Sequence, residues 1–105
     1  MSEPIVVDLG PLAQIAQGQG KCFEIKGQRV AVFHGRDGKV YAIQHTCPHR
    51  GGPLADGLMG DGLVICPNHG HKFNLSTGEG SEPGERVKVY PARIVNGMIQ
   101  LEFLA

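Results

Sequence analysis

Two short segments of the chain combine thiol and imidazole side chains at close spacing. The first holds Cys47 and His49, and the second, after sixteen intervening residues, holds Cys66 and His69. In both segments a proline directly follows the cysteine, and glycines lie nearby. Proline restricts the backbone and glycine permits left-handed turns, so each segment is suited to presenting ligands from a stiff, tight loop. The pattern predicts one metal-binding site built from these four residues.

Two thiolates and two imidazoles suit two kinds of metal centre. One is a structural zinc ion with tetrahedral coordination. The other is a [2Fe–2S] cluster in which two histidines replace two cysteines on one iron. Zinc-binding arms usually place about two to four residues between their ligands, whereas only Pro48 separates Cys47 from His49. The spacing favours the iron–sulfur cluster, and a zinc-braced interaction module without a redox role is the alternative.

The two segments resemble the ligand-binding motifs of the Rieske family. They read CPHRGGPL at residues 47–54 and CPNHGHKF at residues 66–73. The resemblance to soluble Rieske ferredoxins extends over nearly the whole chain. It implies that Cys47 and Cys66 bind the inner iron, and that His49 and His69 bind the outer iron near the surface. It also implies one [2Fe–2S] cluster per chain and a one-electron carrier, not a stand-alone enzyme.

Four positions depart from the membrane-bound members of that family and indicate a low-potential subtype. Gly52 and Asn68 stand where those members carry two further cysteines joined in a disulfide. His71 and Phe73 stand where they carry a serine and a tyrosine that donate hydrogen bonds to sulfur. Fewer donors stabilise the reduced cluster less. The resemblance thus implies a reduction potential near the low end of the Rieske range, which runs from about −150 to +300 mV.

The same resemblance implies two redox systems. In the first, the protein carries electrons from a flavin-dependent reductase to the terminal oxygenase of an aromatic-ring dioxygenase system. In the alternative, it is the small subunit of an NAD(P)H-dependent nitrite reductase. The motif at residues 47–54 suits either system.

Other residues near the motifs have ordinary interpretations. His45 and His71 flank the two segments but lie outside the ligand spacing, and His71 is expected beside the ligands or at the surface. We interpret Cys22 as a small, partly buried residue. Three acidic residues follow the second motif: Glu79, Glu82 and Glu85. We expect them to be solvated loop charges. The alternative is that they dock to a basic surface of a reductase.

Length, charge and cysteine content narrow the class of protein. The chain has 105 residues, which predicts one domain over residues 1–105. Ten basic and ten acidic residues cancel, so no basic surplus favours nucleic acid as a partner. No apolar run approaches the roughly 20 residues that a membrane-spanning helix needs. Three cysteines, an odd number, and an N-terminus without an export-signal pattern predict a cytoplasmic protein with reduced thiols.

The elements that must position the ligands are predicted to be short strands. Sixteen glycines and seven prolines separate brief apolar stretches. Residues 11–16 are expected to form one helical turn, and no segment shows a longer helical period. Turn signals lie at Gly27-Gln28, Asp37-Gly38 and Asn96-Gly97. Strands are expected at residues 5–9, 21–26, 29–34, 40–44, 63–66, 72–74, 86–90, 93–95 and 98–103. One strand bent at Pro91 is the alternative to separate strands at 86–90 and 93–95.

These expected elements define the fold class. We predict an all-β, Rieske-like antiparallel sandwich or barrel with a cluster-binding subdomain of two loops, at about residues 45–80. Residues 45–62 are expected to form a loop without a strand, because seven glycines and prolines interrupt them.

Overall fold

The computed structural model describes residues 4–48, 52–60, 62–67 and 70–104 of the chain. Ten strands and two short 3₁₀ turns are found there, with no α-helix in the described part. The elements are β1 (Pro4–Pro11), η1 (Leu12–Gln14), β2 (Gly20–Ile25), β3 (Gln28–His34), β4 (Val40–Gln44), η2 (Leu54–Asp56), β5 (Leu58–Gly60), β6 (Leu63–Ile65), β7 (Lys72–Asn74), β8 (Val89–Tyr90), β9 (Ala92–Val95) and β10 (Met98–Leu104).

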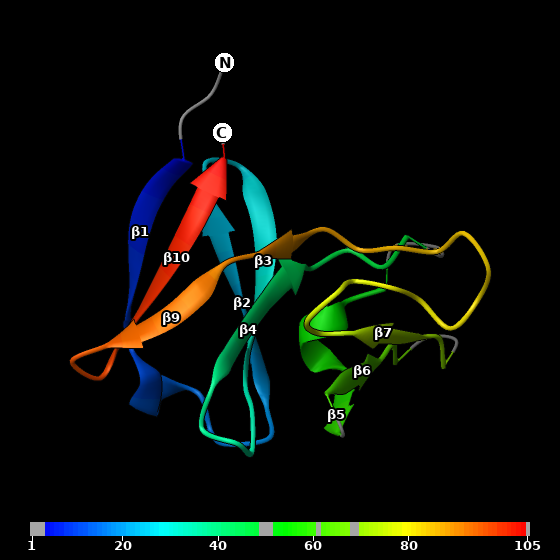
Figure 1. The fold of residues 1–105 in the computed structure, drawn as a ribbon, viewed down its shortest axis with the longest axis horizontal. Helices are drawn as coiled ribbons and strands as arrows, with labels where there is room; N and C mark the ends of the chain where they lie inside the picture. The colour runs from blue at the N-terminus through cyan, green and yellow to red at the C-terminus, as the bar shows by residue number, and fades with distance from the viewer. Residues whose placement is uncertain (1–3, 49–51, 61, 68–69, 105) are drawn as a thin grey trace.

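Two antiparallel sheets form the larger part of the molecule. Their strand orders are β1-β10-β9 and β2-β3-β4-β8 (Figure 1). Side chains from both sheets share one buried core, which includes Val30, Val32, Ile99, Leu101 and Phe103. This arrangement confirms the predicted all-β class with antiparallel pairing.

A third sheet, β5-β6-β7, lies on one side of this sandwich (Figure 1). Its core also includes β3 residues: Ala31 and Phe33 belong to this second core, whereas Val30 and Val32 belong to the first. Successive residues of a strand point to opposite faces, so β3 is covered on both faces. That explains why residues 30–33 form an unbroken apolar run with no alternation of polar residues.

The chain crosses between the two larger sheets at Pro91. Tyr90 ends β8 in the four-stranded sheet, and Ala92 begins β9 in the three-stranded sheet. Proline cannot donate an amide hydrogen bond, so it suits a position between ladders. The predicted strand at residues 86–90 is only Val89–Tyr90. Residues 86 and 87 pair elsewhere: Arg86 forms a bridge with Glu79, and the amide of Val87 donates to the carbonyl of Gly78 at 2.8 Å.

Two hairpins turn on residues with positive φ angles. Asn96 and Gly97 have φ of 51° and 77°, as a tight two-residue turn requires, and this prediction is confirmed. Lys26 and Gly27, with φ of 49° and 80°, form the turn predicted one residue later at Gly27-Gln28. The turn at Asp37-Gly38 lies within a longer connection between β3 and β4, residues 35–39.

Two further predictions about local structure are wrong. Residues 58–60 form β5, although the whole segment 45–62 was expected to be a loop. This three-residue strand pairs with β6 through Met59 and Val64 and is too short to show a periodic pattern. Cys22 is exposed, not partly buried, because β2 is the edge strand of its sheet and the third sheet does not cover that edge.

Within the described residues, no helix has the length and apolar character needed to cross a membrane.

Candidate metal centre

The two predicted cysteine ligands follow strands of two different sheets. Cys47 follows β4 and Cys66 follows β6, and each is 1% exposed. Both belong to the same buried core, together with Phe73 and Leu54. Neither forms a disulfide in the structure. Two thiols therefore reach one apolar core from separate loops, and thiolates are the ligands that hold iron–sulfur clusters.

The first loop is closed at its base by backbone contacts. The amide of Cys47 donates to the carbonyl of Gly52 at 2.8 Å, and Thr46 forms a bridge with Pro53. One step further out, the amide of Leu54 donates to the carbonyl of His45 at 2.8 Å. These contacts hold both ends of residues 47–52 together, so Cys47 sits at a defined position in the core.

The second loop connects β6 to β7. Ile65 pairs with Lys72, so residues 66–71 form the hairpin connection. The amide of Cys66 donates to the carbonyl of His71 at 2.7 Å, and the amide of Gly70 donates to the carbonyl of Cys66 at 3.0 Å. Gly70 has φ of 73°, a conformation that favours glycine.

The predicted ligands His49 and His69 lie outside the described residues. Each falls within one of the two closed loops, which end at described, hydrogen-bonded residues. Among the described residues no three side chains of the metal-binding types converge, as expected when only Cys47 and Cys66 of the four are described. The four-residue ligand set therefore remains a prediction. The burial of Cys47 and Cys66 in one core agrees with it.

The flanking histidines have protein partners that the sequence did not reveal. His45 is 8% exposed, and its Nδ1 accepts a hydrogen bond from the amide of Ala55 at 3.3 Å. Burial lowers the pKa of His45, so the neutral imidazole that can accept this bond is favoured. The His45 side chain therefore links the first loop to η2. No local signal predicts this contact, because Ala55 donates through its backbone.

His71 pairs with an acidic residue. Its Nδ1 lies 2.7 Å from Oε1 of Glu85, and both side chains are 16% exposed. Glu79 and Glu82 are exposed, as expected for solvated loop charges, but Glu85 is not. The expectation is wrong for Glu85 because the chain between Glu79 and Arg86 folds back beside β7.

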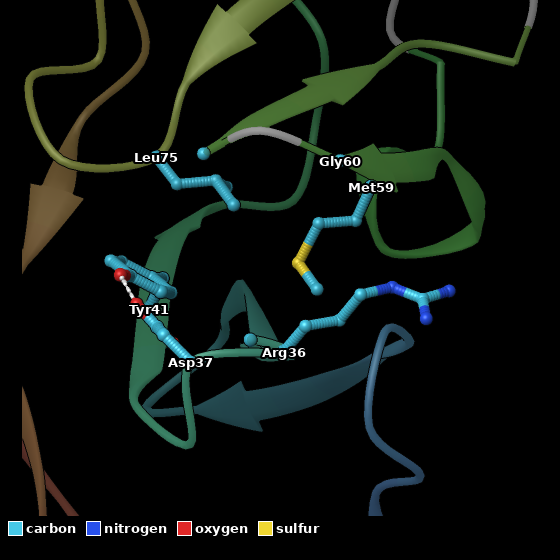
Figure 2. Close-up of a pocket in the computed structure, with 8 residues that line it drawn as sticks. Arg36, Asp37, Tyr41, Met59, Gly60 and Leu75 are labelled. Carbon is cyan, nitrogen blue, oxygen red and sulfur yellow. Dashed lines mark hydrogen bonds between the residues drawn. The ribbon is translucent and has the colours of Figure 1, made fainter.

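A surface hollow of about 270 Å³ lies between the β3–β4 connection and β5 (Figure 2). It is lined in part by Arg36, Asp37, Tyr41, Met59 and Leu75. The Tyr41 hydroxyl donates to Oδ2 of Asp37 at 2.6 Å, and this bond lowers the pKa of Asp37 and raises that of Tyr41. In Figure 2 the Arg36 side chain extends away from this pair. Neither Cys47 nor Cys66 is among the described residues that line the hollow.

The fold and the paired loops define a class of protein, and comparison with known families agrees. Residues 6–102 match the model of the Rieske-like [2Fe–2S] domain. The chain belongs to the Rieske-like [2Fe–2S] domain family. The predicted family and cofactor are confirmed at this level, and the chain is an electron-transfer domain of the Rieske type.

Individual relatives come from two redox systems. The ferredoxin subunit of anthranilate 1,2-dioxygenase from Burkholderia cepacia is 31% identical over 96% of this chain and 97% of its own length. A solved structure from Mycobacterium tuberculosis, assigned as an NADH-dependent nitrite reductase small subunit, is 28% identical with a TM-score of 0.91, covering 98% of both chains. The ferredoxin of carbazole 1,9a-dioxygenase from Nocardioides aromaticivorans IC177 is 27% identical with a TM-score of 0.82, covering 95% of this chain and 97% of that one.

Other curated relatives are much longer than this chain. The match covers 19% of the vanillate O-demethylase oxygenase subunit from a Pseudomonas strain, which is 35% identical over 65% of this chain. The domain thus occurs both in small subunits and within larger oxygenase proteins.

Proposed function

We propose that this protein is a one-electron carrier that passes electrons from a flavin-dependent reductase to the terminal oxygenase of an aromatic-ring dioxygenase system. The observation that carries the proposal is the match to the anthranilate dioxygenase ferredoxin subunit over nearly the full length of both chains. In this role the 105 residues act as one cytoplasmic domain and as an electron-transfer component, without an enzymatic reaction of their own.

In the proposal, Cys47 and Cys66 hold the inner iron and His49 and His69 the outer iron. When bound, the [2Fe–2S] cluster supplies a centre that accepts and releases one electron. The apolar core around Cys47 and Cys66 excludes water from the side of the cluster that these cysteines hold. Backbone hydrogen bonds close the two loops at their ends, from Cys47 to Gly52 and from Cys66 to His71.

A second system is favoured by a specific observation. The fold similarity to the Mycobacterium tuberculosis nitrite reductase small subunit has a TM-score of 0.91. In that alternative the same domain passes electrons within a stable NAD(P)H-dependent nitrite reductase assembly.

The first test of the proposal is the metal content of the freshly purified protein. We expect about two irons and two acid-labile sulfides per chain, and a reduced form with the low average g-value of mixed cysteine and histidine ligation. A colourless protein containing zinc would overturn the electron-carrier proposal and favour a zinc-braced interaction module.

The second test separates the two redox systems. Affinity purification from the native host should recover the chain free or in weak complexes if it serves a dioxygenase. A stoichiometric complex with a sirohaem-containing subunit would instead identify the nitrite reductase system. Electron transfer to each purified candidate acceptor, followed by the visible absorption of the reduced carrier, provides the functional control.

A further inference from the structure

A partly buried side-chain pair joins the second ligand loop to a distant segment. Nδ1 of His71 and Oε1 of Glu85 are 2.7 Å apart, a hydrogen-bond distance. Only 16% of each side chain is exposed, so solvent screens the pair less than it screens a surface ion pair. The contact is therefore able to hold two segments in a defined relation.

On one side, His71 belongs to the frame of the second loop. Its carbonyl accepts the amide of Cys66 at 2.7 Å, which closes residues 66–71. The next residue, Lys72, begins β7 and exchanges hydrogen bonds with Ser81: the Lys72 amide donates to Oγ of Ser81 at 3.1 Å, and the Ser81 amide donates to the carbonyl of Lys72 at 2.8 Å. The backbone of His71 is thus part of the frame that holds Cys66, and the next residue is bonded to the segment that carries Glu85.

On the other side, Glu85 is held in a folded segment. Its amide donates to the carbonyl of Glu82 at 3.1 Å, and its carbonyl accepts the amide of Gly80 at 2.9 Å. The packing is close here, because a Cβ added at Gly80 would lie 2.7 Å from Cβ of Glu85 and 3.0 Å from Cε1 of Phe73. The Glu85 side chain therefore extends from a backbone whose position is set by other contacts.

We propose that Glu85 is a positioning residue for the cluster: through His71 it fixes the second ligand loop against the segment 79–86. The proposal rests on the proposed cluster ligation by Cys66 and His69. It assigns Glu85 a role different from that of Glu79 and Glu82, which are exposed. Glu85 thus has a structural role, whereas Glu79 and Glu82 are solvated charges. The sequence alone does not separate the three residues.

The test compares four single variants and one double variant, all of which retain the ligands. Glu85→Ala removes the contact, and Glu85→Gln keeps an oxygen that can accept from Nδ1 while removing the charge. Glu82→Gln is the matched control, because it removes the same charge from an exposed position in the same segment. His71→Ala removes the other partner and should reproduce Glu85→Ala.

Cluster loss to a chelator, followed by visible absorption, is the first measurement. We expect loss from Glu85→Ala to be about tenfold faster than from the unmodified protein, and loss from Glu85→Gln and Glu82→Gln to stay within about twofold. The double variant His71→Ala/Glu85→Ala should lose its cluster no faster than either single variant. Visible circular dichroism of the oxidised cluster should change in Glu85→Ala and be restored in Glu85→Gln.

Two results would overturn the inference. One is a Glu85→Ala protein indistinguishable from Glu82→Gln in both measurements. The other is a Glu85→Gln protein as impaired as Glu85→Ala, because charge and not positioning would then be the cause. Should Glu85→Ala assemble no cluster, His71→Ala takes its place, and a rate of cluster loss from His71→Ala within about twofold of that from Glu82→Gln would overturn the inference. Absence of iron and sulfide from the unmodified protein would instead refute the proposed function itself.

Discussion

Leu54 offers a direct test of how the first ligand loop depends on the apolar core beneath it. Leu54 is fully buried in the core shared with Cys47 and Cys66, and it lies at the start of η2. Leu58, four residues later, is 77% exposed. Replacing each leucine by alanine makes the same chemical change in two very different environments.

The expected magnitudes follow from these exposures. Full burial of a leucine side chain contributes about 2 kcal/mol, and the cavity left in a core adds about 1 kcal/mol. Leu54→Ala should therefore lower the free energy of unfolding by about 3 kcal/mol. Leu58 buries roughly a quarter of its surface, so Leu58→Ala should cost only about 0.5 kcal/mol.

Thermal unfolding of the cluster-loaded protein, followed by far-ultraviolet circular dichroism at one fixed heating rate, measures the difference. A gap of about 2.5 kcal/mol corresponds to a midpoint roughly 10–20 °C lower for Leu54→Ala than for Leu58→Ala in a domain of this size. Loss of visible absorption should precede or accompany unfolding in Leu54→Ala, because the first loop rests on this core. Midpoints within about 3 °C of each other would refute the assignment of Leu54 to a packed core under the loop.

Three further predictions concern the metal centre and the Asp37–Tyr41 hydrogen bond. His69→Cys should lower the reduction potential by on the order of 100 mV, because a thiolate adds negative charge at the outer iron; voltammetry that finds no change would exclude His69 as a ligand. Phe73→Tyr should raise the potential if its hydroxyl reaches a sulfur, and an unchanged potential would contradict the alignment of Phe73 with the hydrogen-bonding tyrosine of related proteins. Tyr41→Phe should raise the pKa of Asp37, which the tyrosine hydroxyl now holds below its ordinary value. Because that pKa is depressed in the folded state, the stabilisation it brings is present above the unfolded pKa of about 3.9 and is lost as the pH falls through the folded value; NMR titration of the Asp37 carboxyl would reject the reasoning if its midpoint were the same in both proteins.

The sequence predicted most of the β structure because its signals are local. Val40–Gln44 and Lys72–Asn74 are strands as predicted, and Asn96-Gly97 is a hairpin turn. A turn of this kind depends on the φ angles of two residues, which the residue types themselves determine. The short strand Leu58–Gly60 was missed because it is defined by pairing with β6 and not by a pattern of its own.

The candidate site likewise has features that the sequence predicts and features that it does not. The motifs at residues 47–54 and 66–73 identified the family, because ligand type and spacing are written directly in the chain. The burial of Cys47 and Cys66 in one core was not visible there, since it depends on the third sheet packing against β3. The contacts of His45 with Ala55 and of His71 with Glu85 likewise join separate segments.

By itself, then, the order of residues determined the family, the cofactor and the all-β class, and it predicted two thiols and two imidazoles as the ligands. Only the tertiary structure decided which of the remaining polar groups support those loops. Cys22 is exposed and Glu85 is largely buried, although neither has neighbours in sequence that distinguish it. The physical reason is that burial depends on which sheet edges and loop surfaces other segments cover, and that is a property of the folded chain as a whole.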